Sequence, residues 1–266
     1  MMRRIGRGLM AIGLSAGAMV WAGCARMPTP PVGSAEAMAS VVRAWTPTAS
    51  GVYLDGAASR VFQHEDGSRS RRTVTTTDEG WRVEVVRLAG PGEGVSEPVP
   101  MRTVELVRLP ADRGGIGLRA IEEHPERGRG GGSRVVFEPP IALLPPGVGE
   151  GETPPETVGA TLTRGGGRPE QGQAVRTVRL GGTDRLPVFE GVTPEGRVGE
   201  RLEATLDMRF GPVRIRRAEA VWAQAGVGIV GESSAVVVSY AGVPVDRRSS
   251  LAVVVEEIEG EAQPGN

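Results

Sequence analysis

The order of apolar and polar positions predicts mostly β-strands from about residue 52 to the C-terminal end. The alternation is clearest over residues 204–210, where Ala, Leu, Met and Phe alternate with Thr, Asp and Arg. A period of two places successive side chains on opposite faces of a strand. A second long helical pattern is lacking, so strand–helix–strand units are not expected. The predicted strands span residues 59–65, 69–77, 80–89, 101–110, 115–123, 133–138, 157–164, 173–181, 186–190, 197–210, 213–223, 227–240 and 249–259.

Two kinds of local signal describe how these strands connect. Gly211-Pro212 separates two alternating runs and predicts a tight hairpin. Residues 83–88 (VEVVRL) and 104–109 (VELVRL) nearly repeat each other, with a weaker third copy at 175–180, and their alternation slips at Val85-Val86 and Leu106-Val107. Either β-bulges at these pairs bend the sheet, or the similarity is chance in a biased composition. The predicted fold class is all-β, an antiparallel curved sheet or open barrel with one short N-terminal helix.

The short helix is predicted over residues 34–45. Ser34 has the character of an N-cap, and Glu36 lies in the first turn, where the helix dipole favours an acid. Apolar side chains at positions 38, 41, 42 and 45 follow helical spacing, and Pro47 ends the pattern. We expect this helix to cover one side of the sheet.

The first residues predict export. Three arginines precede an uncharged apolar run from Leu9 to Ala22, which is too short to span a bilayer comfortably. The run ends in Val20-Trp-Ala-Gly-Cys24, which resembles the bacterial lipobox, although that pattern usually has an aliphatic residue at the position of Trp21. The resemblance implies that residues 1–23 are removed and that Cys24 receives a diacylglyceryl group. An ordinary cleaved signal is the alternative; that Cys24 is the lone cysteine argues against it.

The same resemblance implies a place in the cell envelope. Ala25 follows the cysteine, and in Gram-negative lipoproteins this favours the outer membrane. Residues 24–33 form a Pro-rich tether, residues 34–259 a single β-rich domain, and residues 260–266 a disordered tail. Residues 139–155 either link two β lobes or pack on the core, as their Ile141, Leu143 and Leu144 suggest.

Composition excludes several function classes. Apart from Cys24 the chain has no cysteine, so neither disulfides nor cysteine-bound zinc are expected. The formal net charge is −1 and basic and acidic residues interleave, which argues against nucleic acid as a partner. Aromatic residues make up 4%, too few to favour a base- or sugar-stacking surface.

Candidate chemistry is sparse. His64 and His124 are the only histidines, and each has acids beside it in the sequence: Glu65 and Asp66, and Glu122 and Glu123. A shared metal site would form only if the strand ends met, and solvated turn residues are the favoured interpretation. Ser233 resembles a nucleophile elbow only faintly, because a strand follows it where the elbow has a helix. Residues 128–133 favour a hairpin turn over a phosphate cradle. No catalytic residue, metal site or cofactor is therefore expected.

The C-terminal half carries a second, weak resemblance. A Pro-rich segment with an apolar centre (137–147) precedes Trp222-Ala-Gln-Ala-Gly-Val-Gly-Ile-Val230. This order is similar to a loose group of exported bacterial β proteins of unknown function, although an aromatic residue after Trp222 is missing. The resemblance implies architecture, with Trp222 in a core and Gly226 and Gly228 permitting a bulge or close strand approach.

The expected function follows from these points together. We expect a lipid-anchored cell-envelope lipoprotein, not an enzyme, acting as a binding or scaffold module. One version carries a lipid or acyl chain, because a concave sheet closed by a helix resembles the half-barrel of bacterial lipoprotein carriers. Its partners are membrane lipid through acylated Cys24 and either a hydrophobic ligand or an envelope protein. The alternative is an envelope hydrolase that uses loop carboxylates.

Overall fold

The computed structural model describes residues 47–54, 58–90, 97–125, 131–148, 151–189, 192 and 197–258. The leader, Cys24, the tether, the predicted helix 34–45 and the tail 260–266 lie outside the described residues. None of the helices in the described part is long and apolar enough to cross a membrane.

Thirteen strands form a single antiparallel sheet in the described part of the chain, which confirms the all-β class. The strands are β1 (Ser59–His64), β2 (Arg69–Thr76), β3 (Gly80–Leu88), β4 (Val99–Arg108), β5 (Ile116–Glu123), β6 (Ser133–Ala142), β7 (Gly151–Glu152), β8 (Glu156–Arg164), β9 (Glu170–Arg185), β10 (Val198–Phe210), β11 (Val213–Gln224), β12 (Gly228–Tyr240) and β13 (Val243–Ile258).

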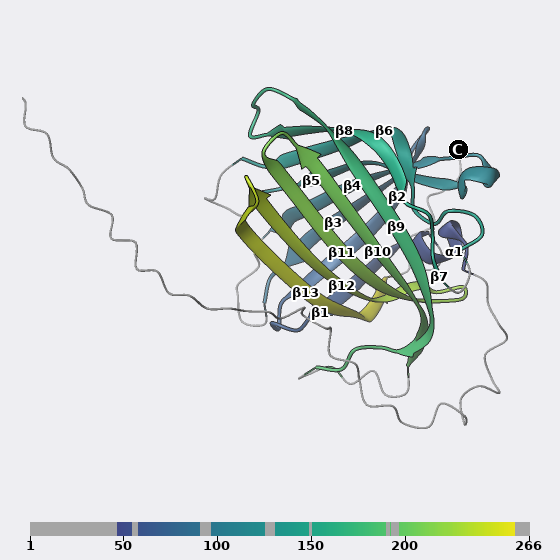
Figure 1. The fold of residues 1–266 in the computed structure, drawn as a ribbon. Coiled ribbons are helices and arrows are strands. Elements are labelled where there is room, and N and C mark those ends of the chain that lie inside the picture. Colours follow the sequence, from purple (N-terminus) through teal and green to yellow (C-terminus); the bar gives the residue numbers. More distant parts are fainter. Residues whose placement is uncertain are drawn as a thin grey trace, which may run out of the picture. The chain divides into compact units, whose positions relative to one another are not determined.

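The sheet closes into a barrel (Figure 1). Apart from β7, each strand pairs with the next one along the chain, so that β6 pairs with β8, and β13 pairs with β1. The two-residue β7 adds to β9 outside this ring, so the described ring has twelve strands. Closure removes the exposed sheet edges that an open barrel would leave.

Alternation decides which side chains face the interior. In β10, Leu202, Leu206 and Phe210 are buried, whereas Thr205 and Arg209 are exposed on the outer face. Residues that pair directly across antiparallel strands point to the same face of the sheet. The pairing register therefore shows which residues of the neighbouring strands also face the interior. The outer surface is largely polar, and the interior holds the main apolar core.

One end of the barrel is covered by the helix α1 (Ala49–Tyr53) and by the β6–β7 connection. Thr48 caps α1 through its side chain, which accepts a hydrogen bond from the Gly51 amide. Val52 of α1 and Leu143 and Leu144 of the connection are buried in the main core. The segment 139–148 therefore packs on the barrel. A 3₁₀ turn (Ala111–Arg113) joins β4 and β5 at the same end.

A second, smaller apolar cluster lies on the outer face. Trp222 of β11 is buried there with Leu186, and Phe189 and Val192 pack against it. A strand was predicted over residues 186–190; in the described part of this run Leu186 and Phe189 instead contribute to this cluster, and Phe189 and Val192 are joined by an isolated β-bridge. Trp222 thus belongs to a core, but the core lies outside the barrel wall.

Several register details bear on the sequence predictions. The predicted bulge at Val85-Val86 is confirmed, and the second irregularity lies between Glu105 and Leu106, one residue before the predicted pair. The predicted hairpin at residues 211–212 joins β10 and β11. The wall between β11 and β12 shifts register after Trp222, and Gly226 and Gly228 have positive φ in the adjoining turn.

Candidate functional site

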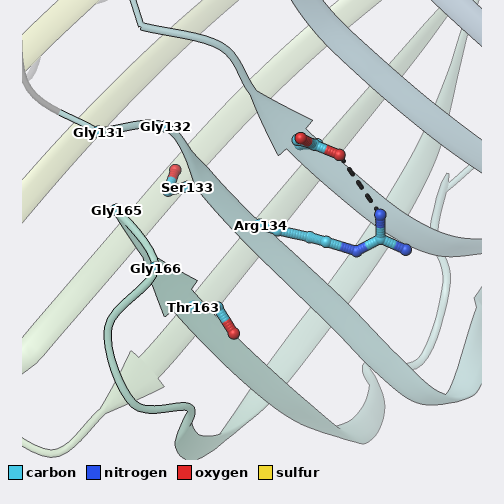
Figure 2. A pocket seen from close by; sticks show the side chains of 8 residues that line it. Gly131, Gly132, Ser133, Arg134, Thr163, Gly165 and Gly166 are labelled. Carbon is cyan, nitrogen blue, oxygen red and sulfur yellow. Dashed lines mark hydrogen bonds and ion pairs between the residues drawn. The ribbon is translucent and has the colours of Figure 1, made fainter.

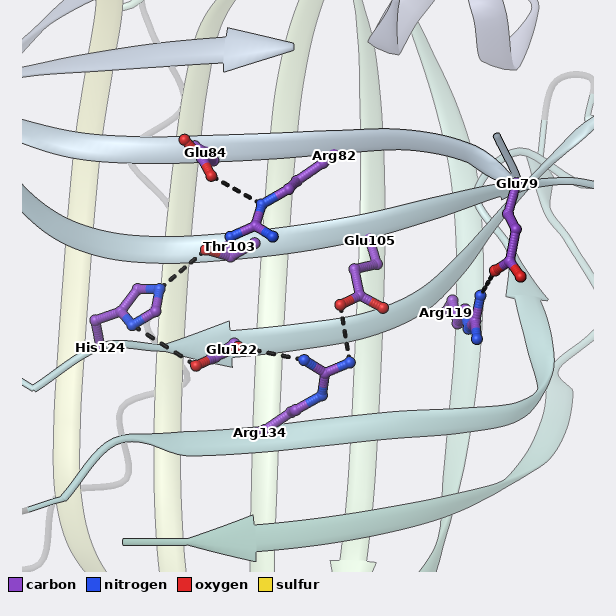
Figure 3. Close-up of polar contacts among 9 residues, drawn as sticks. All are labelled: Glu79, Arg82, Glu84, Thr103, Glu105, Arg119, Glu122, His124 and Arg134. Atoms are coloured by element: carbon purple, nitrogen blue, oxygen red, sulfur yellow. Dashed lines mark hydrogen bonds and ion pairs between the residues drawn. The ribbon is translucent and has the colours of Figure 1, made fainter. Parts of the chain in front are cut away.

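The outer face of β3 to β6 carries a network of paired charges (Figure 3). Arg82 contacts Glu84 at 2.8 Å, and Arg134 bridges Glu105 at 2.8 Å and Glu122 at 3.3 Å. These groups are one-quarter to one-half exposed, where ion pairs contribute little to stability. Each of these two arginines has a carboxylate partner, so neither is an unpaired cation for an anionic ligand.

The two histidines lie at the same barrel end but on opposite sides of the wall. His64 faces the interior, where its Nε2 lies 2.8 Å from Ser70 Oγ. His124 follows β5 and contacts Thr103 at 2.9 Å and Glu122 at 3.8 Å on the outer face. They do not form the shared site considered from the sequence. The described residues contain no group of three or more His, Cys, Asp or Glu side chains suited to a metal ion.

A polar depression of about 420 Å³ lies where the β5–β6 and β8–β9 connections meet (Figure 2). Its walls include Gly131, Gly132 and Gly165, and Arg134 is its only cation among the described residues. Both carboxylate partners of Arg134 remain bound to it. Gly131 and Gly132 belong to the run predicted as a hairpin turn, and residues 128–130 of that run lie outside the described part.

Ser233 lies inside β12, a continuous strand, and so does not occupy a strand-to-helix elbow. The interpretation reached from the sequence therefore holds for this residue.

The barrel interior is divided into a packed part and an accessible part. Between β6 and β11, inward side chains such as Phe137, Leu162 and Phe210 are no more than 1% exposed. Facing them across the ring, several inward side chains of β2 to β4, β11 and β12 remain partly exposed although the wall is closed around them. The partly exposed inward residues include Arg72, Val85, Arg102, Ile215, Glu219, Glu232, Ser234, Val236 and Val238. Water therefore reaches the interior on this side.

Two arginines lie at one level of the accessible interior. Arg72 of β2 pairs with Val85 of β3, and Val85 pairs with Arg102 of β4, so all three face inward in register. Arg60 of β1 continues the row, because it pairs with Arg72. A charged residue at an inward position of a barrel strand lowers the stability of the fold unless it is paired or solvated. This row is therefore the least ordinary feature of the wall.

An ion-pair network crosses the interior. Arg217 of β11, whose side chain is 8% exposed, reaches Glu123 of β5 at 3.1 Å and also pairs with Glu219 of its own strand. In ring order β5 and β11 lie nearly opposite each other, so this contact joins two walls.

The surrounding charges shift the pKa values of the interior groups. Burial lowers the pKa of Arg72, and attraction by Glu232 partly opposes this. Burial acts in the same direction on Arg102, but attraction by Glu232, Glu123 and Glu219 outweighs it and raises the pKa. Both arginines therefore stay protonated at neutral pH, as arginine does in proteins generally.

Two further groups border the same space. Burial raises the pKa of the Tyr53 hydroxyl, and the nearby guanidinium of Arg176 opposes that rise. Arg176 also donates to the carbonyl oxygen of Leu143 at 3.2 Å, which ties the end cover to β9. Burial lowers the pKa of His64, and repulsion by Arg87 and Arg102 acts in the same direction, whereas attraction by Glu232 and Asp66 opposes this.

These interior charges could have been recognised from the alternation of the sequence, although they form no motif. Arg217 and Glu219 occupy the same alternating face as Val213, Ile215 and Val221. A charged residue at an inward-facing position of a strand marks a candidate site. Cys24, the only site residue predicted from the sequence, lies outside the described residues.

Comparisons of the chain with protein-family models, with curated proteins and with solved structures find no match.

Proposed function

We propose that this protein is a lipid-anchored cell-envelope lipoprotein whose barrel is a non-catalytic binding module for a lipid or acyl chain. The observation that carries the binding function is the water-accessible interior, lined by aliphatic side chains such as Val85, Ile215 and Val236. Eight-stranded barrels already hold one small ligand, and a ring of twelve strands is wider. Ligand sites are typically concave and mostly apolar, with a few placed polar groups.

The anchor is supported by the first residues of the sequence. The basic start, the short apolar run and the lone Cys24 together resemble a lipoprotein leader. A diacylglyceryl cysteine carries two chains, which suffice for stable attachment where one chain gives only reversible binding. Ala25 favours the outer membrane as the site of attachment.

Interior carboxylates could instead serve a hydrolase, the alternative that the sequence leaves open. General acid–base catalysis needs two carboxyl groups placed on either side of a scissile bond. Glu123 and Glu219 do approach each other inside the barrel, but Arg217 lies between them and pairs with both. This arrangement is typical of a structural ion-pair network, so we favour binding over hydrolysis.

Metabolic labelling with an alkyne analogue of palmitate tests the anchor. We expect label on the wild-type protein and none on Cys24→Ala, with an intact mass that begins at residue 24. Gly23→Ala is the matched control, because it keeps a small residue before the cysteine and should stay labelled. An unlabelled wild-type protein, or a chain that begins beyond Cys24, contradicts the anchor.

Mass spectrometry of the organic extract of the purified protein tests the binding function. A lipid or acyl chain should be recovered in near-stoichiometric amount after extensive washing with non-ionic detergent. An extract that contains only the detergent, together with no uptake of added lipid, contradicts it.

A further inference from the structure

We propose that Arg72 and Arg102 bind the anionic headgroup of an amphiphilic ligand, a carboxylate or phosphate, while its hydrocarbon chain lies against the aliphatic side chains of the accessible interior. This inference rests on the proposed binding function and names the class of ligand that the module takes.

The first argument is position. Arg72 and Arg102 flank Val85 in register on adjacent strand pairs, so their Cα atoms lie two strand spacings apart, roughly 10 Å. Both side chains point inward and are partly exposed to the accessible space. Two long side chains on this spacing can converge on one headgroup placed above Val85.

The second argument is the number of unused hydrogen-bond donors. A guanidinium carries five N–H donors, which match the oxygens of a carboxylate or phosphate in pairs. Arg72 donates one hydrogen bond, to the carbonyl oxygen of Tyr53 at 3.3 Å. Arg102 Nε is buried without a hydrogen-bond partner and lies out of reach of a ligand, so only the terminal Nη groups of Arg102 can meet a ligand oxygen. A ligand oxygen in the accessible space would satisfy donors that the described chain leaves open.

The third argument is the local charge. In the row of Arg60, Arg72 and Arg102, Arg60 pairs with Glu257 at 3.5 Å. Glu232 is the carboxylate that acts most strongly on both remaining guanidinium groups. Glu123 and Glu219 also attract Arg102, but both of them pair with Arg217. Among the described residues, Glu232 is the one carboxylate that raises the pKa of Arg72, against repulsion by Arg102 and Arg60. An anionic headgroup beside Arg72 would offset that repulsion.

The fourth argument is the apolar surface beside the arginines. Ile215 of β11 pairs with Val238 of β12, and Val236 lies two residues away on the same inward face. All three are partly exposed, whereas the inward residues of the packed side are buried. Charged groups and exposed aliphatic groups thus line one space, and a molecule with an anionic head and an apolar chain matches both.

Photo-crosslinking of the full protein in lipid nanodiscs tests this inference. The probes are a diazirine-bearing palmitate, the corresponding hexadecyl phosphate and the corresponding hexadecanol, which share one chain and differ in headgroup charge. Cross-linked peptides are identified by mass spectrometry. We expect both anions to label peptides of β2 to β4 and β11 to β12 at least tenfold more than the alcohol does, since hydrogen bonds to charged groups are the strong ones.

Arg102→Gln and Arg72→Gln should each lower labelling by the anions about tenfold and leave labelling by the alcohol unchanged. Arg102→Lys keeps the charge and should retain more labelling than Arg102→Gln. Arg82→Gln is the matched control, because Arg82 lies on the outer face of the intervening strand β3. Circular dichroism and thermal melting confirm that each variant folds.

The outcomes separate this inference from the proposed function. Equal interior labelling by the anions and the alcohol, or unchanged labelling in folded Arg102→Gln and Arg72→Gln, overturns the headgroup assignment and leaves lipid binding intact. Absence of interior labelling by all three probes overturns the binding function and the headgroup assignment together.

Discussion

Truncating one inward side chain on each side of the barrel distinguishes the packed part of the interior from the accessible part. Phe137 of β6 is 1% exposed in the main core, and Val236 of β12 faces inward but is partly exposed. Phe137→Ala leaves a cavity that its neighbours fill only in part. Val236→Ala removes two methyl groups from a surface that water already reaches.

The expected magnitudes differ severalfold. Truncation of a buried phenylalanine costs about 3–5 kcal/mol of unfolding free energy. For a domain of this size, each kcal/mol shifts the melting temperature by about 2–4 °C, so Phe137→Ala should melt about 6–20 °C lower. Two fully buried methyl groups would contribute about 1.6 kcal/mol, and partial exposure reduces the expected cost of Val236→Ala to below about 1 kcal/mol.

Urea unfolding followed by circular dichroism measures both costs, with thermal melting as the second readout. The full protein is used in the same detergent for each variant. A cost for Val236→Ala of about 1.6 kcal/mol or more, the value for two fully buried methyl groups, would show that the β12 wall is as tightly packed as the β6 wall. The account of an accessible interior would then be wrong.

Three further predictions concern the titration of two side chains and the room for a side chain at two glycines. Burial lowers the pKa of His64 below its unfolded value of about 6.5, so the unfolded chain binds the proton at a higher pH than the folded chain does. The free energy of unfolding should therefore fall as the pH drops below about 6.5. Urea midpoints should show a smaller fall with pH in His64→Gln than in the wild type. The hydrogen bond from Arg214 lowers the pKa of Asp207, so in an NMR titration this carboxyl should titrate below its usual range and move up in Arg214→Gln. A methyl group at Gly172 would overlap the backbone at the end of β10, whereas a methyl group at Gly231 would make ordinary van der Waals contacts. In urea unfolding, Gly172→Ala should therefore lower the free energy of unfolding by about 1–3 kcal/mol, and Gly231→Ala by about 0.5 kcal/mol or less.

Alternation was sufficient to predict most of the wall, because the interior imposes a period of two on each strand that faces it. It failed where that constraint is absent. The first half of β13 was not predicted, since residues 243–249 carry exposed charges and have no strand on the side away from β12. Leu186 and Phe189 pack in the Trp222 cluster on the outer face, and their apolar character resembles that of a strand.

Proline and closure explain the other differences. Pro139 and Pro140 were read as the start of a loop, but β6 continues through them to Ala142. Closure depends on the pairing of β1 with β13, the first and last strands of the ring, which is a long-range consequence of strand number and register. Local patterns predict curvature through bulges, as at Val85-Val86, but not the point where the sheet meets itself.

The candidate site could not be predicted from motifs because its residues come from strands far apart in the sequence. Arg72, Arg102 and Glu232 share no spacing, and only the pairing register brings them to one space. The proposed anchor is the opposite case, since the prediction for Cys24 rests on its immediate sequence neighbours alone.

Native mass spectrometry of the protein extracted from its own envelope tests most directly whether the barrel holds an anionic amphiphile. We predict a mass increment that fits one acidic lipid or fatty acid, present in the wild type and in Arg82→Gln and lost from the double variant Arg72→Gln, Arg102→Gln. A wild-type protein that carries no such ligand, or a double variant that keeps it in full, would contradict the account.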